Sequence, residues 1–341
     1  MGLPGPDAGR RLDLLDAPAA PAAAQQASAA PDPAPALAAR SAAALADDLA
    51  PQPASAPAPE LAPELLETPA AHGAAAHAAA AHDAVGAEAL TGRELEPIEA
   101  FADLPEGMHD ELARAAHVGD LAPDEELAVY GAALVLTGSA SVCANIVDTP
   151  AERAATRTLV PSRGTLQEGI PLRVVADAGG ARVAIWDQTT IDNALRTCPW
   201  VVDELRGVAD RLQALAGATM GPLGELEEPL LRRVLGRLRL RVLEPGEQLI
   251  HAGNPMPGLV IIGAGALDLI EERSRQSAGA ARPGDLLFAS ALLAGQPAPS
   301  IARAATGGAL VLVADHPTLR ELFESTPELL TILAQAVSMH A

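Results

Sequence analysis

Three regularly spaced histidines are the first residues in this chain whose type suggests chemistry, because imidazole is a common metal ligand. His72, His77 and His82 recur every five residues in an alanine-rich stretch. Ligands on one face of a helix follow each other at steps of three or four residues, whereas a step of five turns the side chain by about 140°. The spacing therefore favours a low-complexity repeat, and no metal site is expected here.

The other reactive side chains are scattered along the sequence. Cys143 is expected on a strand and Cys198 precedes a proline, so both are interpreted as small buried residues and not as nucleophiles. The sequence contains no phosphate-binding loop, dinucleotide fingerprint or serine nucleophile elbow. Single histidines such as His109, His117, His251 and His316 show no metal-type grouping. The sequence therefore predicts a protein that is not an enzyme and that holds no cofactor or metal.

Charge and composition narrow the range of partners. The formal net charge is −21, and every basic residue is an arginine. A chain with this much negative charge repels phosphate backbones and anionic lipids. Neither nucleic acid nor a membrane is therefore expected as a partner. Two cysteines make no disulfide framework, no secretion signal is visible at the start, and no apolar stretch reaches the ~20 residues of a membrane helix. A cytoplasmic protein is expected, and the absence of lysine fits the codon usage of a GC-rich bacterial genome.

Residues 1–97 are expected to form a disordered acidic tail. They are dominated by alanine and proline, and no aromatic residue precedes Phe101. Ordering such a segment costs more conformational entropy than its burial offsets. Residues 10–16 and 60–67 are islands of leucine and acid that could form a helical turn in a partner's groove, and chance clustering in a biased sequence is the alternative.

The rest of the chain contains a duplication. Residues 121–131 repeat the pattern of residues 243–253, and residues 179–185 match residues 307–313. Short runs such as 237–242, 248–252 and 259–262, separated by glycine and proline turns, indicate an antiparallel barrel or sandwich, with a bend at residues 263–265. Helices are expected before the barrels, over residues 101–116 and 223–235, and after them, over residues 201–215 and 329–337. The sequence thus predicts two domains, residues 98–218 and 219–341, each with its own small core.

Five landmarks in the second copy carry a family resemblance. The helix before the barrel is followed by Pro245-Gly-Glu247, by Gly253, by Gly265 before a strand, and by Pro283-Gly-Asp285. In this order they resemble the cyclic-nucleotide-binding domain family. The resemblance implies a mainly β fold with flanking α-helices, here as two tandem jelly-roll β-barrels after the tail.

The same resemblance implies a ligand cassette after the Pro-Gly-Asp turn. Family members place a Gly-Glu pair at the start of a short helix and an arginine before the next strand, so that the helix N-terminus and the arginine neutralise the cyclic phosphate. Here Phe288-Ala289 stand at the Gly-Glu positions and Ala298 at the arginine position. Arg303 is expected to pair with a carboxylate, and a ligand contact would require a shifted strand register. Cyclic nucleotide is therefore an unlikely ligand of this copy.

The first copy has a shorter cassette. Gly164 is followed by Pro171 after seven residues, whereas Gly284 is followed by Pro297 after thirteen, so little room remains for a cassette helix. Arg173 lies near the expected arginine, with Glu168 upstream. They are interpreted either as a remnant phosphate and ribose pair or as surface ion-pair residues.

Together these observations predict a non-catalytic regulatory or scaffold protein in signal transduction that acts through protein–protein contacts of two degenerate domains. A small-molecule or cyclic-nucleotide sensor with a non-standard pocket is the alternative. Protein partners are expected, with the tail as one handle. Residues 201–215 and 329–337 are the expected domain or homodimer contacts, and charge reversal at Asp203, Glu204 and Asp210 is expected to weaken self-association.

Overall fold

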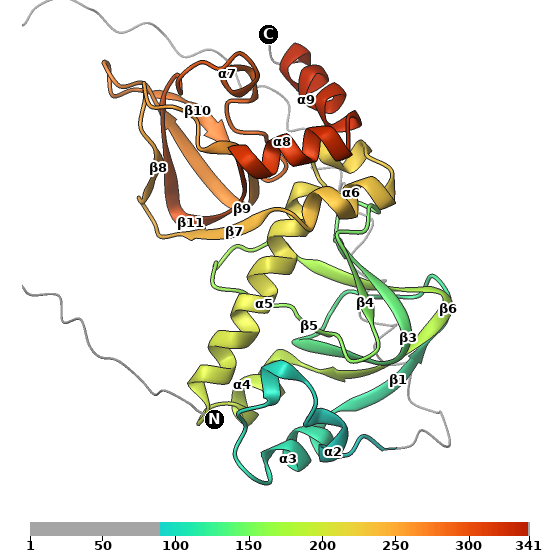
Figure 1. Cartoon of the computed structure of the whole chain (residues 1–341). Helices are drawn as coiled ribbons and strands as arrows, with labels where there is room; N and C mark the ends of the chain where they lie inside the picture. Colours follow the sequence, from blue (N-terminus) through green and yellow to red (C-terminus); the bar gives the residue numbers. More distant parts are fainter. Residues whose placement is uncertain (1–88, 340–341) are drawn as a thin grey trace, which may run out of the picture. The chain divides into compact units, whose positions relative to one another are not determined.

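The computed structural model describes residues 89–339 of the chain (Figure 1). The histidine repeat and both leucine islands lie outside the described residues. We call residues 89–218 the first module and residues 219–339 the second module.

The folded part begins before the boundary expected at Pro97. Helix α2 (Gly92–Leu95) begins with a capping box, in which the side chains of Thr91 and Glu94 each accept a hydrogen bond from the other residue's backbone N–H. Leu90 and Leu95 are buried in one hydrophobic cluster with Phe101. The prediction of a tail is therefore wrong for residues 89–97, because a composition averaged over the whole stretch hides a few leucines that find a core.

The first module contains one six-stranded antiparallel sheet, with helices before and after it in the sequence. The β-sheet has the order β1-β6-β3-β4, with β2 paired to β6 and β5 paired to β3. The elements are η1 (Glu99–Phe101), α3 (Met108–Ala115), β1 (His117–Leu121), β2 (Glu126–Leu127), β3 (Ala132–Ala144), β4 (Glu152–Ala155), β5 (Leu159–Pro161), β6 (Leu172–Trp186), α4 (Gln188–Ala194) and α5 (Pro199–Ala218).

The second module repeats this plan. Its sheet has the order β10-β9-β11-β7, with β8 paired to β11. The elements are η2 (Pro222–Glu225), α6 (Glu228–Leu235), β7 (Arg239–Leu243), β8 (Gln248–Ile250), β9 (Gly258–Ile270), β10 (Ser277–Ala281), α7 (Ala289–Leu293), β11 (Ile301–Asp315), α8 (His316–Ser325) and α9 (Glu328–Met339). The prediction of a mainly β fold with flanking helices is confirmed.

One expected bend is absorbed into a strand. Residues 263–265 lie within β9, which continues from Gly258 to Ile270. Gly265 has φ +71°, and the register against β11 shifts next to it. A glycine in the left-handed region lets the strand bulge without ending.

The duplication extends to individual hydrogen bonds. Asp187 caps α4 by accepting from the backbone N–H of Thr190, and Asp315 caps α8 by accepting from the backbone N–H of Thr318. The two pairs lie 128 residues apart (315 − 187). Since both caps begin a helix directly after the last long strand, the copies share their local structure as well as their pattern.

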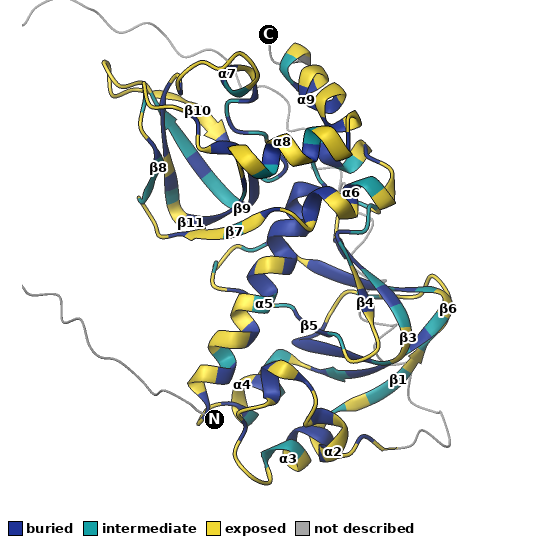
Figure 2. Ribbon diagram, viewed as in Figure 1, coloured by how far each residue is buried: buried dark blue, intermediate teal, exposed yellow. Residues whose placement is uncertain are grey.

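The core contains the two separate clusters expected, one in each module, and a third cluster that joins the modules. One continuous cluster joins Val142 and Val174 of the first module, through Leu215 of α5, to Ile261 and Leu310 of the second. The C-terminal half of α5 is buried (Figure 2). Helix α5 contacts β5 and β3 as well as β9 and β11, which confirms residues 201–215 as a domain contact.

Within residues 89–339, no helix combines the length and the apolar character that crossing a membrane requires.

Candidate functional site

Arg173 at the start of β6 is the centre of the most heavily bonded charged site in the first module. Its guanidinium donates to Glu126 of β2 and to Asp148 in the loop between β3 and β4. It also donates to the carbonyl oxygen of Val147 at 3.1 Å and to that of Ala144 at 3.5 Å. The Arg173 side chain is 8% exposed, so a buried cation is neutralised by two carboxylates of its own chain.

The position of Arg173 in the strand sets the direction of its side chain. Leu172 and Val174, its two neighbours, belong to the hydrophobic core. Successive side chains of a strand point to opposite faces, so Arg173 lies on the other face of β6. Burial alone would lower the pKa of Arg173, but the hydrogen bond to Asp148 and the charge of Glu126 outweigh it and raise that pKa.

Glu168 is not brought to Arg173. It is exposed and lies in residues 162–171, between β5 and β6, where the structure has bends and a turn but no helix. The carboxylates that meet Arg173 come from positions 47 and 25 residues away in sequence. Sequence reasoning missed Glu126 and Asp148, because an exposed acid on a short strand or in a loop carries no sign of the distant strand that it will contact.

The shortened loop is fixed to α5 by buried polar groups. Asp210 accepts from the backbone N–H and the hydroxyl of Thr165, both at 2.8 Å. Gln213 donates to the carbonyl oxygen of Ser162 at 2.9 Å. Asp210 is 1% exposed, so it belongs to the interior and not to a surface for self-association, and the expectation for its charge reversal is wrong on that ground.

In the second module the cassette helix is present but contains no charged residue. Helix α7 begins after Phe288, which has φ 51° and ψ 39°, a left-handed conformation that favours glycine. Ala298, at the expected arginine position, is 3% exposed. Phe288 packs against a cluster formed by the barrel strands, which includes Ile262 and Leu267. Apolar side chains therefore occupy the region of the second module in which an anion would need a charged partner.

Arg303 faces away from that cluster. Ala302 and Ala304 on either side are buried, whereas Arg303 is exposed. Its Cα lies opposite Asp268 in the strand register, but within residues 89–339 its side chain forms no ion pair. The expected pairing is not formed, because an exposed arginine and a half-buried aspartate on neighbouring strands gain little by holding one geometry.

Two cavities among the described residues are small. One of roughly 30 Å³ lies between α4 and α5 beside Arg163 and Arg206, and another of roughly 10 Å³ lies beside Glu152 and Glu228. Sites for drug-sized ligands measure about 300–1,000 Å³. Neither cavity would admit a nucleotide without rearrangement.

The cysteines and histidines form no reactive group in residues 89–339. Cys143 and Cys198 are both buried, and burial raises the pKa of the Cys143 thiol. His109 contacts the carbonyl oxygen of Phe101, and His316 that of Met256. No group of three or more metal-ligating side chains is found in this part of the chain.

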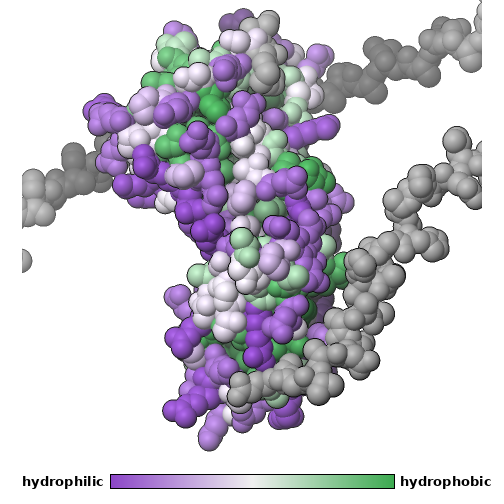
Figure 3. All heavy atoms as spheres, turned by 90° about the vertical axis from the view of Figure 1, so that its right-hand side faces the viewer, coloured by the Kyte–Doolittle hydropathy of each residue, from purple (hydrophilic) through white to green (hydrophobic). Residues whose placement is uncertain are grey.

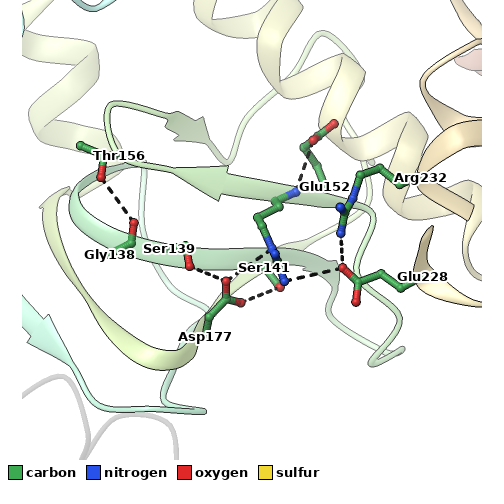
Figure 4. A network of polar contacts seen from close by, with 9 residues as sticks. Gly138, Ser139, Ser141, Glu152, Thr156, Asp177, Glu228 and Arg232 are labelled. Carbon is green, nitrogen blue, oxygen red and sulfur yellow. Dashed lines mark hydrogen bonds and ion pairs between the residues drawn. The ribbon is translucent and has the colours of Figure 1, made fainter.

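A polar network also links the modules (Figure 4). Arg153 of β4 pairs with Asp177 of β6 at 3.5 Å and with Glu228 of α6 at 3.7 Å. Asp177 accepts from the hydroxyls of Ser139 and Ser141. Since the Arg153 side chain is half exposed, these ion pairs contribute little to the free energy of the contact between the modules.

The family comparison agrees with the architecture of the second module. Residues 240–326 match the family model described as Cyclic nucleotide-binding domain. The second module is thus a domain of this family by sequence, and the resemblance seen in its turns is confirmed. No curated protein matches the chain.

Several solved structures are similar to the chain. The regulatory domain of Toxoplasma gondii PKA with cAMP has 15% identity and a TM-score of 0.32, covering 72% of this chain and 95% of its own. A regulatory subunit of a cAMP-independent protein kinase A from Trypanosoma cruzi, bound to guanosine, has 16% identity and a TM-score of 0.30, covering 74% and 87%. The N-terminal domain of a transcriptional regulator from Streptomyces coelicolor A3(2) has 21% identity and a TM-score of 0.32, covering 36% and 91%.

Proposed function

We propose that this chain is a non-catalytic regulatory or scaffold protein whose two cyclic-nucleotide-binding-like domains act through protein contacts and not through bound cyclic nucleotide. The domains would be residues 98–218, extended at their start to residue 89, and residues 219–341. On this proposal the protein works in the cytoplasm, and its N-terminal segment is a further handle for partners.

One observation carries the proposal. Arg173, the cation nearest the expected phosphate position of the first module, is already bonded to Glu126 and Asp148. A cyclic phosphate would have to displace a carboxylate from a buried guanidinium, and it would meet the remaining carboxylate as a like charge. The first module therefore supplies its own anion.

The second module supports the same proposal by a different route. Phe288 and Ala289 stand where a cyclic nucleotide would need a glycine at the helix N-terminus for its phosphate and a carboxylate for its ribose hydroxyl, and Ala298 provides no positive charge. Transferring a phosphate into such surroundings without a partner costs several kcal/mol. Neither module thus offers a free positive charge to a cyclic phosphate: in the first module Arg173 is already paired, and in the second the cassette carries no charge.

Thermal unfolding of the full chain tests the proposal. A ligand at about a hundred times its Kd adds roughly 2.7 kcal/mol, which shifts Tm by several degrees. We expect no shift with millimolar cyclic AMP, cyclic GMP or cyclic dinucleotides. A shift of several degrees that Arg173→Ala abolishes would contradict the proposal.

A ligand sensor is the second candidate, and one observation favours it. The Asp148 side chain is 98% exposed although it pairs with a buried arginine, so an anion could compete for its place. In that case Asp148→Asn would increase the affinity for a nucleotide, while Glu168→Gln would reduce it by removing the ribose contact. No response in either variant would leave the scaffold function as proposed.

Self-association is a separate part of the proposal. Helix α9 packs on α7, η2 and α8 of its own module, and its outer face exposes Leu330, which is 41% accessible. A homodimer contact over residues 329–337 would bury that leucine. Sedimentation of Leu330→Ser against the unaltered chain checks this point.

A further inference from the structure

Val129 and Ile146 are the two most exposed large hydrophobic residues among those the structure describes. They are 80% and 74% accessible, and the next such residue is 50% accessible. Val129 lies between β2 and β3, and Ile146 lies between β3 and β4. Single exposed apolar residues are ordinary on protein surfaces, so what matters is whether these two belong together.

One guanidinium holds both of their loops. Arg173 bonds Glu126, three residues before Val129, and it bonds Val147 and Asp148, which directly follow Ile146. The two loops therefore lie next to each other, attached to a buried side chain. A surface fixed in this way binds without a large cost for ordering its loops.

The rim of this surface is negatively charged. Residues 122–131 and 145–152 contain five acids and no arginine. The single cation beneath them is buried and already paired with two of the five. The acids are Asp124, Glu125, Glu126, Asp148 and Glu152. Protein interfaces combine an apolar centre with a polar rim, and complementary charge directs the partner to the site.

The second module has no counterpart. His251 stands at the position of Val129, 122 residues later (251 − 129). The large hydrophobic residues exposed there lie elsewhere, on β7, α7 and α9. The apolar pair is thus not a by-product of the shared fold, because the duplicated fold forms without it.

We propose that Val129 and Ile146 form a docking surface for an apolar segment of a partner protein that carries lysine or arginine beside its apolar residues. This inference rests on the proposed scaffold function and names the surface through which the first module acts. A second copy of this chain fits less well, since two such acidic rims would repel each other. Figure 3 shows one face of this acidic protein, on which hydrophilic residues predominate and hydrophobic ones gather in small patches.

Peptide binding to the full chain tests the surface. The probe is a fluorescent synthetic peptide of leucine and lysine, and the matched peptides replace lysine with glutamate or leucine with serine. We expect the leucine–lysine peptide alone to bind, with affinity that falls as salt rises. The double variant V129S/I146S should raise Kd about tenfold or more, because binding then no longer buries two apolar side chains away from water. The control V242S changes a 43% exposed valine on β7 and should leave Kd unchanged.

Three outcomes would overturn the inference. One is equal peptide affinity in V129S/I146S and V242S, and another is equal binding of the glutamate peptide. The third is a dimer of the full chain that V129S/I146S dissociates, which would assign the surface to a second copy. Nucleotide-dependent stabilisation of the chain would instead contradict the proposed function, so the two failures are distinguishable.

Discussion

Gly217 of α5 lies directly against the backbone of Gly263 in β9, and a Cβ atom on Gly217 would overlap the Gly263 carbonyl. On the other side of this contact, a Cβ on Gly263 would come within 2.5 Å of the Ala214 Cα. Helix and strand therefore meet backbone to backbone where the two modules join. This close approach lies within the cluster that joins the two modules.

Gly217→Ala should push α5 and β9 apart at this contact, because the added methyl group would overlap the Gly263 carbonyl. Overpacking a tight interior costs about 1–3 kcal/mol, and here the obstacle is backbone, which cannot turn aside as a side chain can. We expect the free energy of unfolding to fall by about 2–3 kcal/mol in chemical denaturation. Gly207→Ala is the matched control, because Gly207 is also in α5 but has no atom within 4 Å of its added Cβ. That variant should gain about 0.5–1 kcal/mol from helix propensity, and equal losses in both variants would contradict the close contact.

Arg173→Ala should loosen the loops on either side of it. The change removes hydrogen bonds to two backbone carbonyls and leaves Glu126 and Asp148 facing each other. Because both carboxylates are themselves substantially exposed, we expect a loss of about 1–3 kcal/mol and not the full cost of a stranded buried charge. Hydrogen exchange of residues 145–150 should rise. Arg303→Ala is the comparison, and a similar loss there would show that Arg173 has no special role.

Asp210→Ala should release the shortened loop from α5. Two hydrogen bonds from Thr165 to the buried Asp210 are lost, and no other partner of the Thr165 backbone N–H is described, so a cost of about 1–3 kcal/mol is expected. Exchange of the amide of Thr165 should accelerate. Asp203→Ala removes an exposed acid of the same helix, paired only with Arg206, and should change stability by less than about 0.5 kcal/mol. Unchanged exchange at Thr165 in Asp210→Ala would count against the clamp.

The two helix caps should make stability depend on acid pH. Hydrogen bonds from Thr190 lower the pKa of Asp187, and hydrogen bonds from Thr318 lower the pKa of Asp315. A folded-state pKa below the unfolded value of about 3.9 means that the contribution is present above that pH and is lost as the pH falls through the folded value. Asp187→Asn with Asp315→Asn keeps both caps neutral, so the fall in Tm below about pH 4 should become shallower. An unchanged pH profile would show that these carboxylates do not contribute.

The sequence predicted the fold from local signals. The alternating runs, the glycine turns and the match of residues 179–185 to residues 307–313 are patterns along the chain itself, so they could be recognised without a structure. The buried state of Cys143 and Cys198 followed in the same way. The apolar character of the second cassette was visible because the residues that a phosphate needs are missing from consecutive positions.

The tertiary structure decided what those elements face. Glu126 and Asp148 meet Arg173 only because β2 and the loop after β3 come to rest beside the start of β6. Asp210 seemed a surface acid, yet the loop of Thr165 covers it. Nothing in the sequence distinguishes Gly217 from the other glycines, and its need for a small residue comes only from the contact between α5 and β9. A sequence fixes each residue's chemistry and its local conformation, but which charges neutralise each other depends on contacts between distant segments, and these form only when the core closes.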